Sequence, residues 1–484
     1  MNLTHFMPAL PEVILIFAIL GFSLWGALGR NKEKPWIFRG TLVVFLGLIV
    51  SLFFATSLRD ITFNGHFFHD SFSAFIKYVV AVATFVILLN LHSHLSFFKV
   101  RQFEFAVLLL CAVLGMFILI SSNDFLPMYI ALEMQSLCFY VLIGLFHKER
   151  HVTEAVVKYF ILGGVASGFI LFGISFIYGY SGTTNFDVLE NALNSLGTMD
   201  IGFSVGLAFV ICGLAFKASA VPFHMWTPDV YQSTPYALLI LIATAPKITV
   251  LGFLMRFLCG PIYNGLSTWQ PILICIALAS MVLGAVAAVP QTNLRRFLAY
   301  ASISSVGFSL IGIAFANETG LQASLFYTSL YVFAMIGLLT CVMILLRNGA
   351  TVDTLADLKG LAIQRPFVAV AIAILILTLS GLPPFPGFLG KLFLLQAAVG
   401  SEFYTVAIFM VLTTVVTAYY YLNILKIMFF DSGQASSLMG TISANLSLNY
   451  LIVITSIGVL TLLIFMPKYL FNWTNLAAVT LFYT

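Results

Sequence analysis

The chain alternates long apolar runs with short polar breaks, and this pattern predicts a polytopic membrane protein. A helix that crosses a bilayer needs about 20 predominantly apolar residues, and about fourteen such runs follow one another here. Prolines and glycines interrupt the twelfth run, so we expect a broken helix there. The expected spans lie near residues 9–28, 38–57, 71–91, 103–121, 124–146, 154–179, 202–221, 235–257, 268–289, 294–315, 322–346, 366–398, 403–430 and 449–470.

The composition agrees with this all-α membrane pattern. Hydrophobic residues make up 61% of the chain and charged residues 8%, whereas a soluble domain carries about 25% charged residues. Little sequence remains for a soluble domain, so the lipid bilayer is an expected partner and nucleic acid is not. The first apolar run contains Glu12 and lacks a basic leader, so we interpret it as a retained span and not a cleaved signal.

Basic residues gather in alternate loops. Cytoplasmic loops carry an excess of Lys and Arg, so we expect these loops in the cytoplasm, or in the matrix of an organelle, and both termini on the opposite side. The opposite side carries only Arg59, Arg256 and Lys468 as basic residues. The basic residues of the expected cytoplasmic side are Arg30, Lys32, Lys34, Arg39, Lys99, Arg101, Lys148, Arg150, Arg295, Arg296, Arg347, Lys359, Arg365 and Lys426.

Three lysines lie inside or beside apolar runs where the helix is irregular. Lys217 precedes Pro222, Lys247 directly follows Pro246, and Lys391 follows the segment LSGLPPFPGFLG. A charge at the centre of a bilayer costs roughly 2.5–3.5 kcal/mol on insertion scales, so a chain keeps one mainly where it lines a polar pathway or has a partner. Prolines also free backbone carbonyls that water can satisfy. We therefore predict that these lysines line a hydrated path.

Other ionisable residues are weaker candidates for the same path. Glu133 lies near the middle of the fifth span, where a carboxylate indicates function, although a neutral Glu bonded inside the bundle is the alternative. Glu154 and Lys158 are four residues apart and form either a local ion pair or a proton-uptake relay. His224 lies in a loop rich in prolines and aromatics, where it can relay protons or simply be a satisfied loop residue.

The remaining polar residues of the spans have plainer interpretations. Lys77 is expected to extend its ammonium to the membrane interface. The six cysteines are scattered without a CxxC motif, so we interpret them as small buried hydrophobic residues. The tenth span carries a row of hydroxyls that either hold waters or allow close helix packing: Ser302, Ser304, Ser305 and Ser309.

Two broken helices five spans apart predict an internal repeat of spans four to eight and nine to thirteen. Five is odd, so the second copy is inverted in the membrane, as in many transporters. Lys217 of the first copy is then expected to correspond to Lys391 of the second. The predicted units are a three-helix segment at 1–100, the repeats at 101–260 and 261–432, and a C-terminal helix and tail at 433–484.

Four segments together resemble a known family. These are ALEMQSL with Glu133, FKASAVPFHMWTPDVYQ with Lys217, ATAPK with Lys247 and LSGLPPFPGFLGK with Lys391. They are similar to motifs of the antiporter-like, proton-pumping subunits of respiratory complex I, the NADH:quinone oxidoreductase, and of multi-subunit cation/proton antiporters. The likeness covers about residues 100–430. The segments ALEMQSLCFYVL and YGYSGTTNF and the lysine at 391 resemble the subunit N (subunit 2) branch most.

The resemblance implies roles for these residues. Glu133 and Lys217 would form the charge pair of the first half-channel, Lys247 would bridge the two halves, and Lys391 would end the exit half-channel. Relatives often carry His where this chain has Ser305, so bridging there needs water or nearby side chains. We therefore leave Ser305 out of the candidate site.

The resemblance also implies partners. No cofactor or metal is expected in this chain, although bound lipid is allowed. NADH, FMN, iron–sulfur clusters and quinone would belong to partner subunits of this respiratory-chain translocase, so this chain would carry no redox chemistry itself. Other membrane-arm subunits, including neighbouring antiporter-like ones, are the expected partners. The expected location is the bacterial cytoplasmic membrane, or the mitochondrial inner membrane for an organellar protein.

Two rival functions remain open. A cation/proton antiporter subunit would share the fold, but a sodium site usually uses clustered carboxylates and carbonyls, whereas lysine predominates in these spans. A structural membrane subunit would use its charges only to fix helix packing. Three lysines at irregular helices argue against that function.

Overall fold

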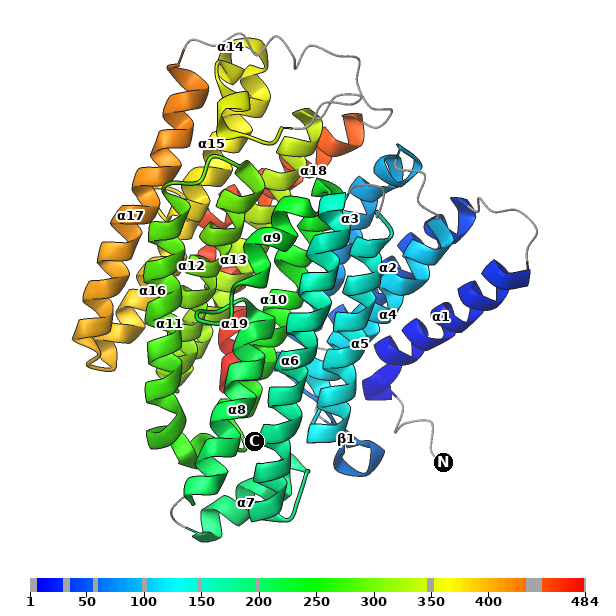
Figure 1. Cartoon of the computed structure of the whole chain (residues 1–484), viewed down its shortest axis with the longest axis vertical. Coiled ribbons are helices and arrows are strands. Elements are labelled where there is room, and N and C mark those ends of the chain that lie inside the picture. The colour runs from blue at the N-terminus through cyan, green and yellow to red at the C-terminus, as the bar shows by residue number, and fades with distance from the viewer. Residues whose placement is uncertain are drawn as a thin grey trace.

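Long apolar helices make up almost the whole protein (Figure 1). The computed structural model describes residues 7–28, 35–54, 60–97, 102–146, 150–196, 200–345, 352–431 and 446–482. Within these ranges, 13 helices are long and apolar enough to span a membrane, and the shorter apolar helices Pro366–Ser380 and Pro386–Gly400 form the broken span. The expected all-helical polytopic fold is confirmed. Several basic loop residues used to predict the orientation lie outside the described residues: Arg30, Lys32, Lys34, Arg59, Lys99, Arg101, Lys148 and Arg347.

The helices follow the predicted spans closely. The first group is α1 Leu10–Leu28, α2 Pro35–Phe54, α3 Ser71–Phe97, α4 Gln102–Ser121, α5 Phe125–Gly144, α6 Arg150–Ser181, α8 Ile201–Ala218, α9 Trp226–Ser233 and α10 Tyr236–Cys259. The second group is α11 Leu266–Ala288, α12 Leu294–Ala314, α13 Glu318–Leu345, α15 Pro366–Ser380, α16 Pro386–Gly400, α17 Tyr404–Phe429, α18 Leu446–Phe465 and α19 Pro467–Val479.

Local sequence signals set several of the helix starts. Asp124 precedes α5, and its carboxylate accepts a hydrogen bond of 2.8 Å from the Leu126 N–H. Asn293 precedes α12 and accepts one of 3.0 Å from the Arg296 N–H. Both side chains satisfy N–H groups that a helix start leaves free. Pro366 and Pro386 stand at the starts of α15 and α16, where a missing N–H costs nothing.

Short elements cover the two ends of the bundle (Figure 1). One end carries α7 Phe186–Leu196 and an antiparallel hairpin of β1 Asp60–Thr62 and β2 Phe67–His69, joined by η2 Phe63–Gly65. Asn123 ties these together, since its amide donates to the Gly65 carbonyl and to the Asp187 carboxylate. The opposite end carries η4 Leu355–Leu358 and α14 Leu361–Gln364, within the segment expected as a surface helix or loop.

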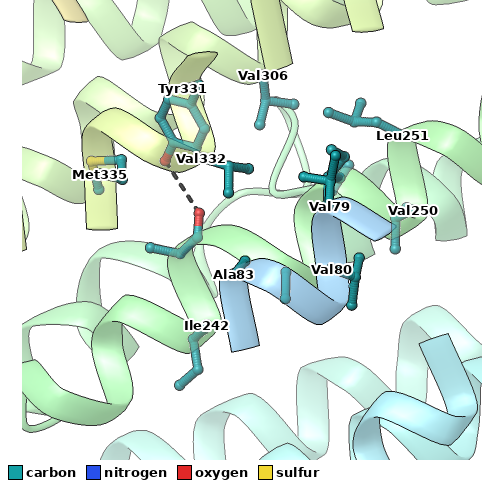
Figure 2. Packing of buried hydrophobic residues seen from close by; sticks show 14 of the residues in the cluster. Val79, Val80, Ala83, Ile242, Val250, Leu251, Val306, Tyr331, Val332 and Met335 are labelled. Atoms are coloured by element: carbon teal, nitrogen blue, oxygen red, sulfur yellow. Dashed lines mark hydrogen bonds between the residues drawn. The ribbon is translucent and has the colours of Figure 1, made fainter. Parts of the chain in front are cut away.

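The core of the bundle lies around α10, α12 and α13. Every residue of α10 is buried. Figure 2 shows Val79 and Val80 of α3 near Val250 and Leu251 of α10, with Val306 of α12 close by. A polar side chain on α10 is therefore surrounded by protein, so its charge depends on partners from neighbouring helices.

Candidate functional site

Lys217 lies at the C-terminal end of α8, just before the first helix break. The helix ends at Ser219, which adopts a left-handed conformation with φ 69°. The last carbonyls then need other partners, and the indole N–H of Trp226 donates to the Phe216 carbonyl at 3.0 Å. A cation in the last helical turn is also favoured by the partial negative charge of that end. The break therefore holds Lys217, only 9% exposed, inside the bundle.

Two residues of α5 meet the Lys217 ammonium. Its Nζ donates to Ser136 Oγ at 2.7 Å and lies 3.5 Å from Glu133 Oε1. The Ser136 hydroxyl donates its own hydrogen to the Leu132 carbonyl, so its oxygen is left to accept from the lysine. Ser167 of α6 donates to the same Glu133 oxygen. The structure thus brings together the two residues expected to form a charge pair.

Lys247 occupies the centre of the buried helix α10. Its Nζ donates to Ser302 Oγ of α12 at 2.8 Å and lies 5.2 Å from the centre of the Tyr231 ring. The Ser302 hydroxyl in turn donates to the Ala299 carbonyl at 2.7 Å. Pro246 remains inside the helix, so α10 is proline-containing but unbroken. The pattern of an ammonium facing a hydroxyl oxygen repeats that at Lys217.

Lys391 lies in α16, just after the second helix break. Its Nζ donates to the Ser380 carbonyl at 2.8 Å and to Thr417 Oγ1 of α17 at 3.2 Å. The Ser380 carbonyl belongs to the free end of α15, so the lysine satisfies a group that the break exposes. Gly381 makes this break possible because it adopts φ 76°. At Gly387 a Cβ atom would collide with the Thr378 carbonyl, so glycine lets α16 start directly against α15.

Comparison with known proteins identifies the family. The family described as NADH:quinone oxidoreductase/Mrp antiporter, TM, matches residues 122–417. This chain belongs to that family. It is 40% identical over 434 residues to NADH-quinone oxidoreductase subunit N of Paramagnetospirillum magneticum, covering 88% of each chain. The resemblance inferred from the four motifs is confirmed.

Solved structures agree with this membership. A chain of respiratory complex I from Thermus thermophilus aligns with a TM-score of 0.79 and 26% identity, over 96% of this chain and 98% of that one. A chain of the Mrp complex from Dietzia sp. aligns with a TM-score of 0.82 but 21% identity, over 100% of this chain and 98% of that one. The second likeness shows a shared fold and nothing more.

One face of α12 connects the surroundings of two of the lysines in this antiporter-like chain. Ser302 bonds Lys247, and the ring of Phe308 lies 4.7 Å from Lys391 Nζ. Between them, Ser305 interacts with the Tyr327 hydroxyl. A cavity of about 10 Å³ beside Lys247 is lined by Ser305, Ser309, Thr328 and Tyr331 among others. That volume is on the order of the space that one water needs.

The hydroxyl row of the tenth span allows close helix packing, as one of the two expectations had it, and also contacts buried side chains. Ser302 and Ser305 face the lysine and tyrosine side chains, whereas Ser304 donates to the Met281 carbonyl of α11 at 3.2 Å. A Cβ atom on Gly284 would lie 2.5 Å from the Ser304 backbone nitrogen, so α11 and α12 pack closely there.

The sequence showed the hydroxyls of the tenth span but not the directions in which they point. It gave no signal for Ser136, Ser167, Tyr231, Tyr327 or Thr417, which reach the site from other helices.

The lower-ranked candidates lie toward the end of the bundle that carries α14. Lys158 Nζ lies 2.8 Å from Glu154 Oε1, so the local pair is present, and 3.3 Å from Asp229 Oδ2 of α9. Glu154, Lys158 and Asp229 line a polar pocket of about 400 Å³. His224 stands between α8 and α9, half-buried, with its ring centre 6.5 Å from that of Tyr300. These residues therefore surround the second half of the broken span, away from Glu133.

Lys77 corrects an expectation from the sequence. It does not reach the membrane interface: its side chain is 0% exposed, and Nζ lies 2.5 Å from Glu12 Oε1 of α1. Asp70 and Arg256 form a second buried pair, with Asp70 Oδ1 2.6 Å from Arg256 Nη2, and both interact electrostatically with Lys77. The expectation was wrong because the partner carboxylate comes from a helix distant in sequence.

The Ser302 contact leads to a prediction about Lys247. In the Ser302→Ala variant the buried ammonium loses its only side-chain acceptor among those the structure describes. A hydrogen bond to a charged group contributes about 1.5–3 kcal/mol, so the rate of proton pumping in proteoliposomes should fall by about tenfold or more. Ser304→Ala is the matched control, since its hydroxyl faces α11. Equal rates in both variants would contradict this prediction.

Proposed function

We propose that this chain is a proton-translocating membrane-arm subunit of an NADH:quinone oxidoreductase. The observation that carries the proposal is that three lysines are buried at broken or proline-containing helices, each facing a hydroxyl or carbonyl oxygen. Burying a lysine in a membrane span is costly, so such residues are rare and mark functional pathways. The chain is then a multi-pass protein of the bacterial cytoplasmic membrane, or of the mitochondrial inner membrane in an organelle.

The proposed route runs from Glu133 and Lys217 through Lys247 to Lys391. A lysine can carry a proton because it exists as ammonium or amine, and burial makes its charge state sensitive to its neighbours. Glu133 stabilises the protonated form of Lys217 from 3.5 Å. Movement or protonation of Glu133 would remove that stabilisation, so the proton would pass onward. The cavity lined by Lys247 and Ser305 supports a water between the two halves.

Glu133 is the residue of the proposed route that a partner subunit can contact directly. Its side chain is 24% exposed, although it lies on the apolar helix α5. Its neighbours Ile130 and Leu137 on α5 are exposed as well. An ionised carboxylate at this depth is costly against lipid, so we expect a partner subunit to cover it. That partner would be one of the membrane-arm subunits and would control the charge of Glu133.

The energy for pumping would come from these partners. Moving one proton against 100 mV takes about 2.3 kcal/mol, and we assign NADH, FMN, iron–sulfur clusters and quinone to other subunits of the complex. Glu154, Lys158 and His224 would serve proton uptake from the cytoplasmic side. Bound lipid remains compatible with the chain itself. In this scheme the chain transmits energy and performs no redox chemistry.

Sodium exchange is the weaker alternative. A fold shared at 21% identity with an Mrp chain does not transfer an activity, whereas relatives named as subunit N reach 40% identity. Glu133 is the one carboxylate among the four residues of the proposed route, and its described partners are an ammonium and a hydroxyl. A sodium site would favour several carboxylates and carbonyls. Both observations support proton transfer.

The function is tested by pumping measurements on the purified complex. Lys391→Met removes the last proton carrier. The number of protons pumped per NADH oxidised should therefore fall by the number that this chain transports. Lys426→Met at the exposed end of α17 is the matched control and should pump normally. Acidification should be unchanged when sodium is replaced with potassium. Normal pumping by the Lys391 variant would contradict the route, and a strict sodium requirement would favour cation exchange.

A further inference from the structure

The two helix breaks of this chain share one backbone geometry. At the first break, the Ser219 N–H donates to the Phe216 carbonyl and the Ala220 N–H donates to the Ala215 carbonyl. At the second break, Gly381 donates to Thr378 and Leu382 donates to Leu377. The left-handed residues Ser219 and Gly381 have φ 69° and 76°. Ser219 and Gly381 are therefore equivalent positions, and they set the register between the two broken spans.

This register changes the expected correspondence between charged residues. Counted from Ser219 and Gly381, Pro222 matches Pro384, and Asp229 matches Lys391. Lys217 precedes its break and Lys391 follows its own, so these two lysines are not equivalent positions. The second half of each broken span thus carries one ionisable residue at the same place, an acid in α9 and a base in α16.

The two half-helices end at opposite ends of α12. Arg295, in the first turn of α12, donates to the Thr234 carbonyl just after α9, at 3.1 Å. Asn317, just after α12, donates to Ser401 Oγ just after α16, at 2.7 Å. Asp229 and Lys391 therefore lie in opposite halves of the protein, as an inverted arrangement requires.

The Asp229 carboxylate is shared between two cations. Its Oδ2 lies 3.3 Å from Lys158 Nζ, and its Oδ1 accepts from Arg296 Nη1 of α12 at 2.8 Å. Arg296 also donates to Gln232 on the next turn of α9 at 3.2 Å. An arginine keeps its proton, whereas a lysine can release one. Arg296 therefore neutralises Asp229 permanently, and Lys158 can lose its proton without leaving the carboxylate unpaired.

The surroundings of Asp229 admit water. It is 35% exposed and lies in the wall of the polar pocket of about 400 Å³. The other titratable or charged groups that line this pocket are His151, Glu154, Lys158, Arg295 and Asp353. Asp353 is bonded to Arg295 at 2.5 Å. The pocket thus contains one ion pair between Arg295 and Asp353. It also contains the Asp229 carboxylate, which stays bonded to Arg296 when Lys158 dissociates.

We propose that Asp229 is a positioning residue for proton uptake, which holds the Lys158 ammonium at the wall of the polar pocket. Asp229 occupies in α9 the position that Lys391 occupies in α16. Arg296 anchors the carboxylate and α9. As its bond to Asp229 opens, the Lys158 ammonium passes a proton inward, and the amine that remains then takes a proton from pocket water. The proposal rests on the proposed function, because it concerns the beginning of the same route. It predicts that uptake and release use equivalent positions of the two half-helices.

The test measures NADH oxidation and proton pumping by the intact complex in proteoliposomes, across a range of pH. Asp229→Asn should lower the pumping rate by about fivefold, the scale of one lost ion pair, and should change the pH profile of pumping. Asp229→Glu should restore both. Asp353→Asn removes a carboxylate of the same pocket that bonds Arg295 and should leave the profile unchanged. The amount of this chain in the purified complex checks folding.

The outcomes separate the inference from the proposed function. Unchanged pumping in Asp229→Asn, or equal losses in Asp229→Asn and Asp353→Asn, would overturn the positioning role. Loss without rescue by Asp229→Glu would also overturn it, provided that the complex retains the variant chain. Lys391→Met is measured in parallel. Normal pumping by that variant would refute the proposed route itself, whatever the Asp229 variants do.

Discussion

Replacing Lys247 with methionine is expected to stop proton transfer through this chain. Lys247 lies on α10, where every residue is buried, and Ser302 is the side chain that accepts its hydrogen bond. A group that takes and gives a proton during transfer contributes about 10²–10⁴-fold to a rate. The number of protons pumped per NADH oxidised should therefore fall by the share that passes through this chain. The measurement is the acidification of proteoliposomes that contain the purified complex.

The Lys247→Arg variant separates charge from proton transfer. Arginine keeps the positive charge beside Ser302 and Tyr231 but cannot be deprotonated in proteins. If Lys247 is a proton carrier, the Arg variant should be as inactive as the Met variant. If Lys247 only fixes the packing of α10 against α12, the Arg variant should retain most of the pumping. Normal pumping in Lys247→Arg would thus refute the central step of the proposed route.

Replacing Lys77 alone is expected to destabilise the chain strongly. Lys77→Met leaves the Glu12 carboxylate buried at 4% exposure without its ammonium. Removing one partner of a buried ion pair costs about 3–5 kcal/mol, which is a large fraction of the stability of a typical protein. The purified variant complex should lose NADH:quinone activity much faster on warming, and should contain less of this chain.

The double variant tells whether the pair itself is needed. Glu12→Leu with Lys77→Met replaces both charges with apolar side chains of similar size, and such replacements are often neutral or stabilising. We expect the double variant to regain most of the thermal stability and normal pumping. Phe67 and Phe117, whose ring centres lie 4.9 and 5.9 Å from Lys77 Nζ, would then pack against the methionine. If the double variant pumped poorly although stable, the pair would have a role in proton transfer.

Some positions were predictable because their signals are local. A run of about 20 apolar residues predicts a span wherever it occurs, and the observed helices fall close to the predicted ranges. Prolines and glycines near 222 and 381–387 predict helix breaks for the same reason, since they act on their own backbone. Glu154 and Lys158 form the expected pair because one helix fixes their spacing.

Other positions depended on contacts between helices that are distant in sequence. Ser136 and Glu133 reach Lys217 from α5, and Glu12 reaches Lys77 from α1. Asp229 joins Lys158 of α6 to Arg296 of α12. None of these pairings has a signal in its own segment, so the sequence predicts the wrong position for the Lys77 ammonium and indicates no role for Asp229.

The amino-acid sequence by itself determined the membrane-spanning fold, the family, and the three lysines at irregular helices. Only the tertiary structure decided which oxygen each lysine meets and which charges share a pocket. The physical reason is that helices such as α10 and α13 are buried on nearly every side and have no distinct polar face, so their sequences do not indicate which face meets which neighbour. That choice is made by the packing of the whole bundle, through small residues and scattered hydrogen bonds between helices.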